Sequence, residues 1–127
     1  MPSAIDYFLS TGIDEVRSAT VQTLGDNGFR VTTLPDGNLV AERGSLGATV
    51  ALGALAGSRF HVKFPVSFFT APDGRTVVRL SRTAAAGAIK GGALGAARTA
   101  KAFDTTTAAL HAAFSADGAL TESLAQP

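Results

Sequence analysis

Histidine and cysteine, the side chains most often used for catalysis and metal binding at neutral pH, are scarce in this chain. Its 127 residues include two histidines and no cysteine. His61 lies two residues from both Arg59 and Lys63, and these cationic neighbours would repel a metal ion. His111 follows Leu110, beside the apolar stripe of a predicted helix. No HxxxH pair or cluster of carboxylates accompanies them. We therefore expect no enzyme activity, no cofactor and no metal site.

The glycine-rich stretch 87–98, GAIKGGALGAAR, contains the residue types that hold phosphate groups. Its spacing does not match GxxxxGK[ST], and no parallel-strand context precedes it. A helix that begins after these glycines could still hold an anion at its N-terminus, with Arg98 in the first turn. That alternative stays open.

Charge is distributed unevenly along the chain, although the net charge is only +1. Residues 59–101 contain eight basic residues and one acidic residue, a net charge of +7. The stretches 1–28 and 102–127 each have a net charge of −3. Either the basic middle attracts an anionic partner, or the acidic ends of the chain fold onto it.

A basic sheet face is the sharpest candidate for binding nucleic acid. Four side chains would project from that face: Arg59, His61, Lys63 and Arg79. Proteins that bind single strands combine such charge with several stacking aromatic rings. Here only Phe69, near Val77, lies in the same register. A solvated basic face is therefore favoured, nucleic acid is an unlikely partner, and an anion or nucleic-acid binder remains the alternative function.

The elements that position these residues begin with an apolar run, 4–10, which predicts a strand. Residues 11–14 have the form of a capping box led by Thr11, followed by apolar residues at helical spacing. Asn27 and Gly28 supply a stop signal. We predict a helix over 13–26.

Two Pro-Asp-Gly turns predict two β-hairpins, because proline and glycine suit the successive positions of a three-residue loop. The turn at 35–37 would pair Arg30 with Glu42 and Val31 with Ala41. The turn at 72–74 would pair Phe68 with Val78 and Val66 with Leu80. Both registers place compatible partners opposite each other, which indicates an antiparallel sheet.

The strand that leads into the second hairpin alternates strictly between apolar and polar residues from Arg59 to Phe68. This period of two predicts a sheet covered on one side. Pro65 lacks a backbone N–H and would place this strand at an edge or at a bulge. Helical spacing resumes at Phe103, with Thr107, Leu110 and Phe114 on one stripe and a stop at 117–118. We expect an α+β fold with a four- or five-stranded antiparallel sheet and helices packed on one face.

Two glycine-rich segments are the candidate ligand or packing contacts. The uncharged run 44–58 is too short to span a membrane and could be a helix, a buried strand or a loop. The ladder after the second hairpin repeats glycine at every fourth position. It suits close packing of a helix near the sheet, self-association, or a lipid surface. The glycines concerned are Gly53, Gly57, Gly87, Gly91 and Gly95.

These features lead to one hypothesis, a soluble single domain over 1–127 that acts as a small, non-catalytic binding or assembly module. An apolar or amphipathic small molecule, or a partner's apolar surface, would lie near the glycine-rich segments, where small residues leave room. A homodimer is a further candidate partner. The first ten residues lack the basic start of a signal peptide, and we expect a cytoplasmic location.

Overall fold

The structure is a computed structural model that describes residues 3–44, 61–82 and 92–126, the first five of the last range by their backbone alone. These residues form two helices and six strands. In chain order they are β1 (Ala4–Leu9), α1 (Ile13–Asp26), β2 (Arg30–Thr33), β3 (Leu39–Arg43), β4 (Val62–Thr70), β5 (Thr76–Ser81), α3 (Gly92–Ala116) and β6 (Leu120–Gln126).

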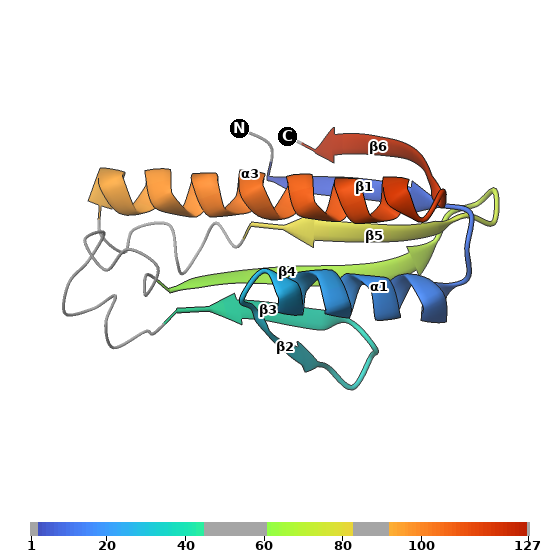
Figure 1. Ribbon diagram of the computed structural model, residues 1–127, viewed down its shortest axis with the longest axis horizontal. Coiled ribbons are helices and arrows are strands. Elements are labelled where there is room, and N and C mark those ends of the chain that lie inside the picture. The colour runs from blue at the N-terminus through green and yellow to red at the C-terminus, as the bar shows by residue number, and fades with distance from the viewer. Residues whose placement is uncertain (1–2, 45–60, 83–91, 127) are drawn as a thin grey trace.

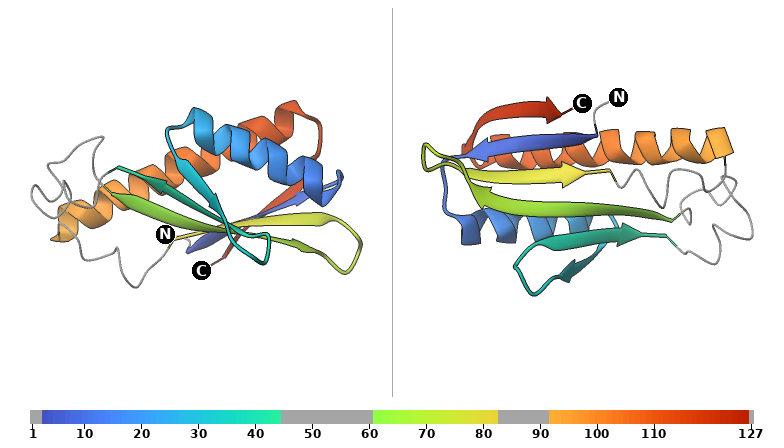
Figure 2. Two further views of the ribbon diagram at one scale, coloured as in Figure 1. Left: turned by 90° about the horizontal axis from the view of Figure 1, so that it is seen from below. Right: turned by 180° about the vertical axis from the view of Figure 1, so that it is seen from behind.

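All six strands form one antiparallel sheet in the order β2-β3-β4-β5-β1-β6. Both helices pack on the same face of this sheet (Figures 1 and 2). The predicted α+β class is confirmed, and so are helices on one face. The sheet is larger than predicted because β6 returns beside β1. Its polar, mostly exposed sequence has no apolar alternation that would reveal a strand.

The two Pro-Asp-Gly hairpins have the predicted registers. In the first, Arg30 pairs with Glu42, and the N–H of Leu34 donates to the carbonyl of Asn38 at 2.7 Å. In the second, Phe68 pairs with Val78. Each turn ends on a glycine with positive φ, as its geometry requires. Local turn chemistry therefore determines the register of both strand pairs.

Helix α1 has the predicted bounds, but the expected capping box is wrong. Gly12 is the N-cap residue, and no side chain caps the helix. The carbonyl of Thr11, the expected cap, accepts a hydrogen bond from the Thr76 hydroxyl at 2.8 Å. At the other end, Gly28 adopts a φ of +86° and the N–H of Phe29 donates to the carbonyl of Leu24. This is a Schellman cap.

Pro65 lies in the interior of the sheet, so the edge or bulge predicted for its strand is wrong. β4 pairs with β3 on one side and β5 on the other. The N–H of Ala71 donates toward β5, and backbone donors alternate in direction along a strand. The nitrogen of Pro65 therefore points toward β5 as well. There the pairing ends at Val66 and Leu80, so no hydrogen bond of the described ladder is lost.

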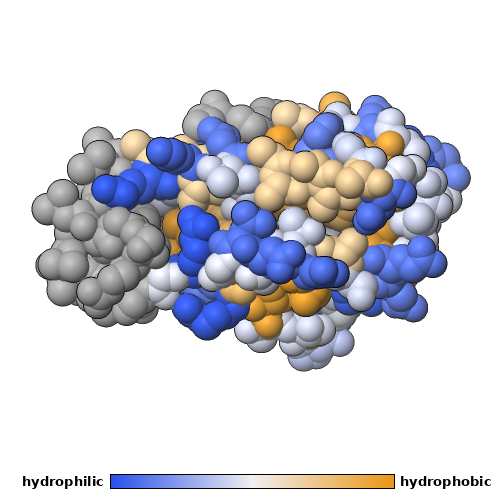
Figure 3. Space-filling model, in the orientation of Figure 1, coloured by the Kyte–Doolittle hydropathy of each residue, from blue (hydrophilic) through white to orange (hydrophobic). Residues whose placement is uncertain are grey.

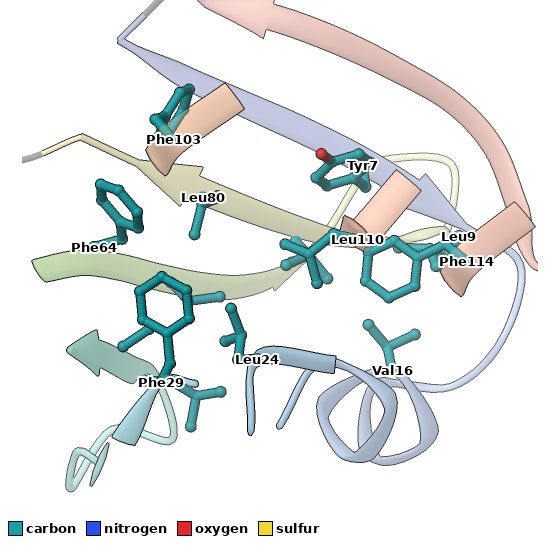
Figure 4. Packing of buried hydrophobic residues seen from close by; sticks show 14 of the residues in the cluster. Tyr7, Leu9, Val16, Leu24, Phe29, Phe64, Leu80, Phe103, Leu110 and Phe114 are labelled. Atoms are coloured by element: carbon teal, nitrogen blue, oxygen red, sulfur yellow. The ribbon is translucent and has the colours of Figure 1, made fainter. Parts of the chain in front are cut away.

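The core lies between the helices and the sheet (Figure 4). Phe64 on β4 packs edge-on against Phe103 of α3, with ring centroids 5.6 Å apart. The α3 stripe differs by one position from the prediction, since Thr106 is buried and Thr107 is only half-buried. From residue 97 onward, five side chains form the buried side of α3: Ala102, Phe103, Thr106, Leu110 and Phe114.

Candidate functional site

Alternation along the strands divides the sheet into a core face and an outer face. On β4, Phe64 and Val66 are fully buried beneath the helices, whereas Lys63 and Phe69 are exposed on the opposite side. No described element covers this outer face, which is in front in the right-hand view of Figure 2. The outer face is defined here by Asp6 and Phe8 of β1, Val77 and Arg79 of β5, Lys63 and Phe69 of β4, Arg30 of β2, Glu42 of β3, and the adjoining Arg75 and Glu122.

An apolar row crosses the middle of the outer face. Val77 pairs with Phe8 on one side and Phe69 on the other, and it is fully buried although no helix covers it. Two guanidinium groups lie over the flanking rings. Arg75 is 4.6 Å from the ring centroid of Phe8, and Arg79 is 5.2 Å from that of Phe69. We call these five residues the arginine–aromatic cluster.

Arg79 is held in place by a buried carboxylate. Its Nε and Nη2 donate to Asp6 Oδ1 and Oδ2 at 2.7 and 2.9 Å, a two-pronged geometry that suits guanidinium and carboxylate. The amide of Gln126 donates to Asp6 Oδ2 at 3.1 Å. The side chain of Asp6 is only 5% exposed. The hydrogen bonds that Arg79 donates to Asp6 raise the pKa of the Arg79 guanidinium. Each charge in this pair is therefore neutralised by the other.

Arg75 bridges the second hairpin turn and β6. Its side chain donates to Asp73 at 2.9 Å, to the hydroxyl of Thr121 at 2.9 Å and to Glu122 at 3.2 Å. The backbone N–H of Arg75 also donates to Asp73 and lowers the pKa of that carboxyl. Both arginines of the cluster thus keep one orientation over their rings.

A second charged row crosses the β2 end of the outer face. Arg30, Glu42 and Lys63 lie opposite one another on three neighbouring strands. The Nε2 atom of His61 contacts Glu42 Oε2. This hydrogen bond is the largest of several effects that lower the pKa of Glu42. Glu42 therefore stays ionised and offsets its basic neighbours.

Two of the four predicted basic-face residues, Lys63 and Arg79, belong to the outer face. His61 adjoins it through Glu42, and Arg59 lies outside the described residues. His61 and Lys63 lie beside Glu42, and Arg79 is paired with Asp6. With His61 taken as neutral, basic and acidic side chains are equally numerous among the described residues on and around this face. The basic ones are Arg30, Lys63, Arg75 and Arg79, and the acidic ones are Asp6, Glu42, Asp73 and Glu122. This balance does not favour an anionic partner.

The predicted glycine contacts mostly fall outside the described residues. This holds for Gly53, Gly57, Gly87 and Gly91, while Gly95 lies in the first turn of α3. His111 is exposed on α3, beside a shallow hollow against β1 and β6. In the described ranges, histidines and carboxylates form no group of three that could hold a metal ion.

Several residues of the site were not predicted from the sequence, among them Asp6 and Phe8. Their strand was expected, but its place between β5 and β6 was not. The stretch 4–9 does not alternate clearly, since Tyr7 and Phe8 are both aromatic and point to opposite faces. Only the pairing of Asp6 with Arg79, 73 positions along the chain, reveals the role of that carboxylate.

The chain matches no model of a known protein family, and comparisons with curated proteins and with solved structures find no match either. No helix in the described ranges is long and apolar enough to cross a membrane.

Proposed function

We propose that this protein is a non-catalytic assembly module that forms a homodimer through the outer face of its sheet. The observation that carries the proposal is the arginine–aromatic cluster at the centre of that face. An antiparallel sheet with one side in water normally carries polar residues on that side. Here Phe8 and Phe69, on either side of the buried Val77, interrupt the polar surface, and Phe69 remains 38% exposed.

The composition of the outer face supports a protein partner. Aromatic residues and arginine are enriched at the centres of protein interfaces, surrounded by a polar rim. The cluster supplies two aromatic rings and two arginines around a buried valine. Because Asp6 and Glu122 already hold the arginines, little side-chain freedom remains to be lost on association.

The charge balance of the outer face supports a second copy of this chain as that partner. A strongly charged partner would meet as many repulsive groups as attractive ones. A two-fold symmetric dimer places one face against the same face of its partner, so self-complementarity is required. A face with equal numbers of acidic and basic groups meets that requirement. Two sheets can pack in this way at a separation of about 10 Å.

Sedimentation velocity across a range of protein concentrations tests the proposal. We expect the wild-type protein to reach twice its monomer mass of 12.9 kDa. Phe69→Asp places a charge at the centre of the interface and should weaken the dimer by more than about tenfold, as for a central anchor residue. Val21→Asp on α1 is the matched control, because Val21 is also 38% exposed but lies on the helix side.

Two results would contradict this proposal. One is a wild-type protein that stays monomeric at every concentration. The other is a Phe69→Asp protein that dimerises as tightly as Val21→Asp. Circular dichroism melts of both variants establish that each is folded before the comparison is made.

A further inference from the structure

A cleft of about 300 Å³ opens between the start of α1 and the end of α3. It lies on the helix side of the molecule, where Figure 3 shows pale-orange apolar residues bordered by hydrophilic ones. It is therefore separate from the outer face of the sheet. Its volume is at the lower end of the range for small-molecule sites.

The floor of the cleft is the top of the hydrophobic core. Leu9 of β1, Val16 of α1 and Phe114 of α3 line it, and Figure 4 shows these three side chains gathered at one end of the core. Each is at most 2% exposed. An apolar ligand body would thus meet a surface built from three rigidly packed elements.

The rim of the cleft is negatively charged. Glu15 and Asp117 both line it and both are exposed. Within the described part of the chain, neither carboxylate has a basic partner. Glu15 lies in the first turn of α1.

The end of α3 adds to this negative potential. A helix has a partial negative charge at its C-terminus, which basic residues in the last turn commonly offset. The last turn of α3 contains no basic residue, and Asp117 follows it directly. A helix C-terminus without a basic residue in its last turn and two carboxylates therefore surround an apolar floor.

We propose that this cleft binds a small amphipathic cation, a protonated primary amine on a short aliphatic or aromatic body. The body would lie over Leu9, Val16 and Phe114, and the ammonium group would lie between Glu15 and Asp117. About ten non-hydrogen atoms fill such a volume, if each takes roughly the 30 Å³ of a liquid water molecule. This inference does not depend on dimerisation.

The test is a titration of the ¹⁵N-labelled full chain with n-hexylammonium, followed by amide chemical shifts. Hexanol and hexanoate are probes of similar size that are neutral and negatively charged. We expect saturable shifts at Thr11, Glu15 and Ala119. Hexylammonium should bind at least about fivefold more tightly than hexanol, because of its charge, and hexanoate more weakly than either.

Variants separate the rim from the floor. Glu15→Gln combined with Asp117→Asn should abolish the preference for hexylammonium over hexanol, whereas Asp104→Asn, an exposed carboxylate elsewhere on α3, should leave it unchanged. Ala19→Leu, which fills the cleft from α1, should remove the binding of both probes. Equal binding of all three probes, shifts confined to other residues, or a preference that survives the double substitution would overturn the proposal.

Discussion

At the scale of single residues, Asp6 is a buried carboxylate whose stability in the fold depends on its partners. A carboxylate that is 5% exposed is tolerable only because Arg79 donates two hydrogen bonds and Gln126 a third. If one charge of such a pair is removed, the other remains desolvated and uncompensated. The loss of stability therefore depends on which partner of the pair is replaced, and on whether the other charge remains.

Arg79→Leu should lower the free energy of unfolding by about 2–3 kcal/mol, below the range for fully buried pairs because Arg79 is 42% exposed. Asp6→Asn should destabilise the wild-type protein, yet stabilise the Arg79→Leu variant, since a neutral amide is easier to bury than an unpaired carboxylate. Urea unfolding of the four proteins at one low concentration measures both effects. The same sign for Asp6→Asn in both backgrounds would contradict this account.

Glu42 makes stability depend on pH. Its pKa lies below the ordinary value of 4.5, first because of the hydrogen bond with His61 and then because of nearby positive charges. A carboxyl whose pKa is lower in the folded protein stabilises it at pH values above the unfolded pKa. That stabilisation is lost as the pH falls through the folded pKa.

Glu42→Gln should therefore lower the free energy of unfolding near neutral pH. The difference from the wild-type protein should shrink as the pH falls below 4.5. Urea unfolding at a series of pH values measures it. A difference that stays constant down to about pH 3, well below the ordinary glutamate range, would show that the ionised carboxylate is not responsible.

At the scale of elements, the two helices end in the same way. Gly28 after α1 and Gly118 after α3 both have positive φ. In each case the next residue donates its N–H to a carbonyl five residues back, Phe29 to Leu24 and Ala119 to Phe114. These Schellman caps turn the chain directly into β2 and β6. The two edge strands of the described sheet thus depend on glycine at one position each.

Two glycines near the C-terminal end of α1, one inside the helix and one after it, should respond to alanine with opposite signs. Gly28→Ala forces a side chain into a φ of +86° and should destabilise the protein by about 1–2 kcal/mol. Gly25 lies inside the helix with nothing within 4 Å of an added Cβ. Gly25→Ala should therefore stabilise by about 0.4–1 kcal/mol. Thermal melts of both variants measure the two effects. Equal shifts in melting temperature would contradict the role assigned to Gly28 in the helix cap.

At the scale of the whole molecule, the uneven charge of the sequence is largely balanced by folding. The acidic β1 lies between the basic β5 and the acidic β6, and Asp6 and Glu122 pair with Arg79 and Arg75. This arrangement corresponds to the second of the two readings of the charge pattern, in which acidic ends fold onto a basic middle. The outer face consequently lacks the one-sided charge that attracts a polyanion.

A fluorescent single-stranded oligonucleotide should accordingly show no change in anisotropy with this protein, even at about 50 mM salt, where phosphate contacts are strongest. The triple variant Asp6→Asn/Asp73→Asn/Glu122→Gln removes the ion-pair partners of Arg79 and Arg75 and is expected to bind weakly, with an affinity that falls as salt is raised. Tight binding by the wild-type protein would contradict the pairing argument and revive the anion-binding alternative.

The features that sequence patterns predicted correctly are those that depend on local rules. Pro-Asp-Gly turns specified two hairpins and their registers, down to the pairing of Arg30 with Glu42. Strict alternation assigned the faces of β4, and the Asn27–Gly28 stop ended α1. In each case the cause lies within a few residues, in fixed φ angles or in a two-residue period, so no distant contact is needed.

The order of the strands in the sheet could not be predicted from local patterns, and the candidate site depends on that order. β1 pairs with β5 and β6, more than 60 residues away along the chain, and this places Phe8 beside Val77 and Asp6 beside Arg79. Pro65 is compatible with an inner strand because the pairing of β4 with β5 ends at Val66, the residue that follows Pro65 in the chain. Such non-local pairing is selected by burial of the whole core, which no short stretch of sequence encodes.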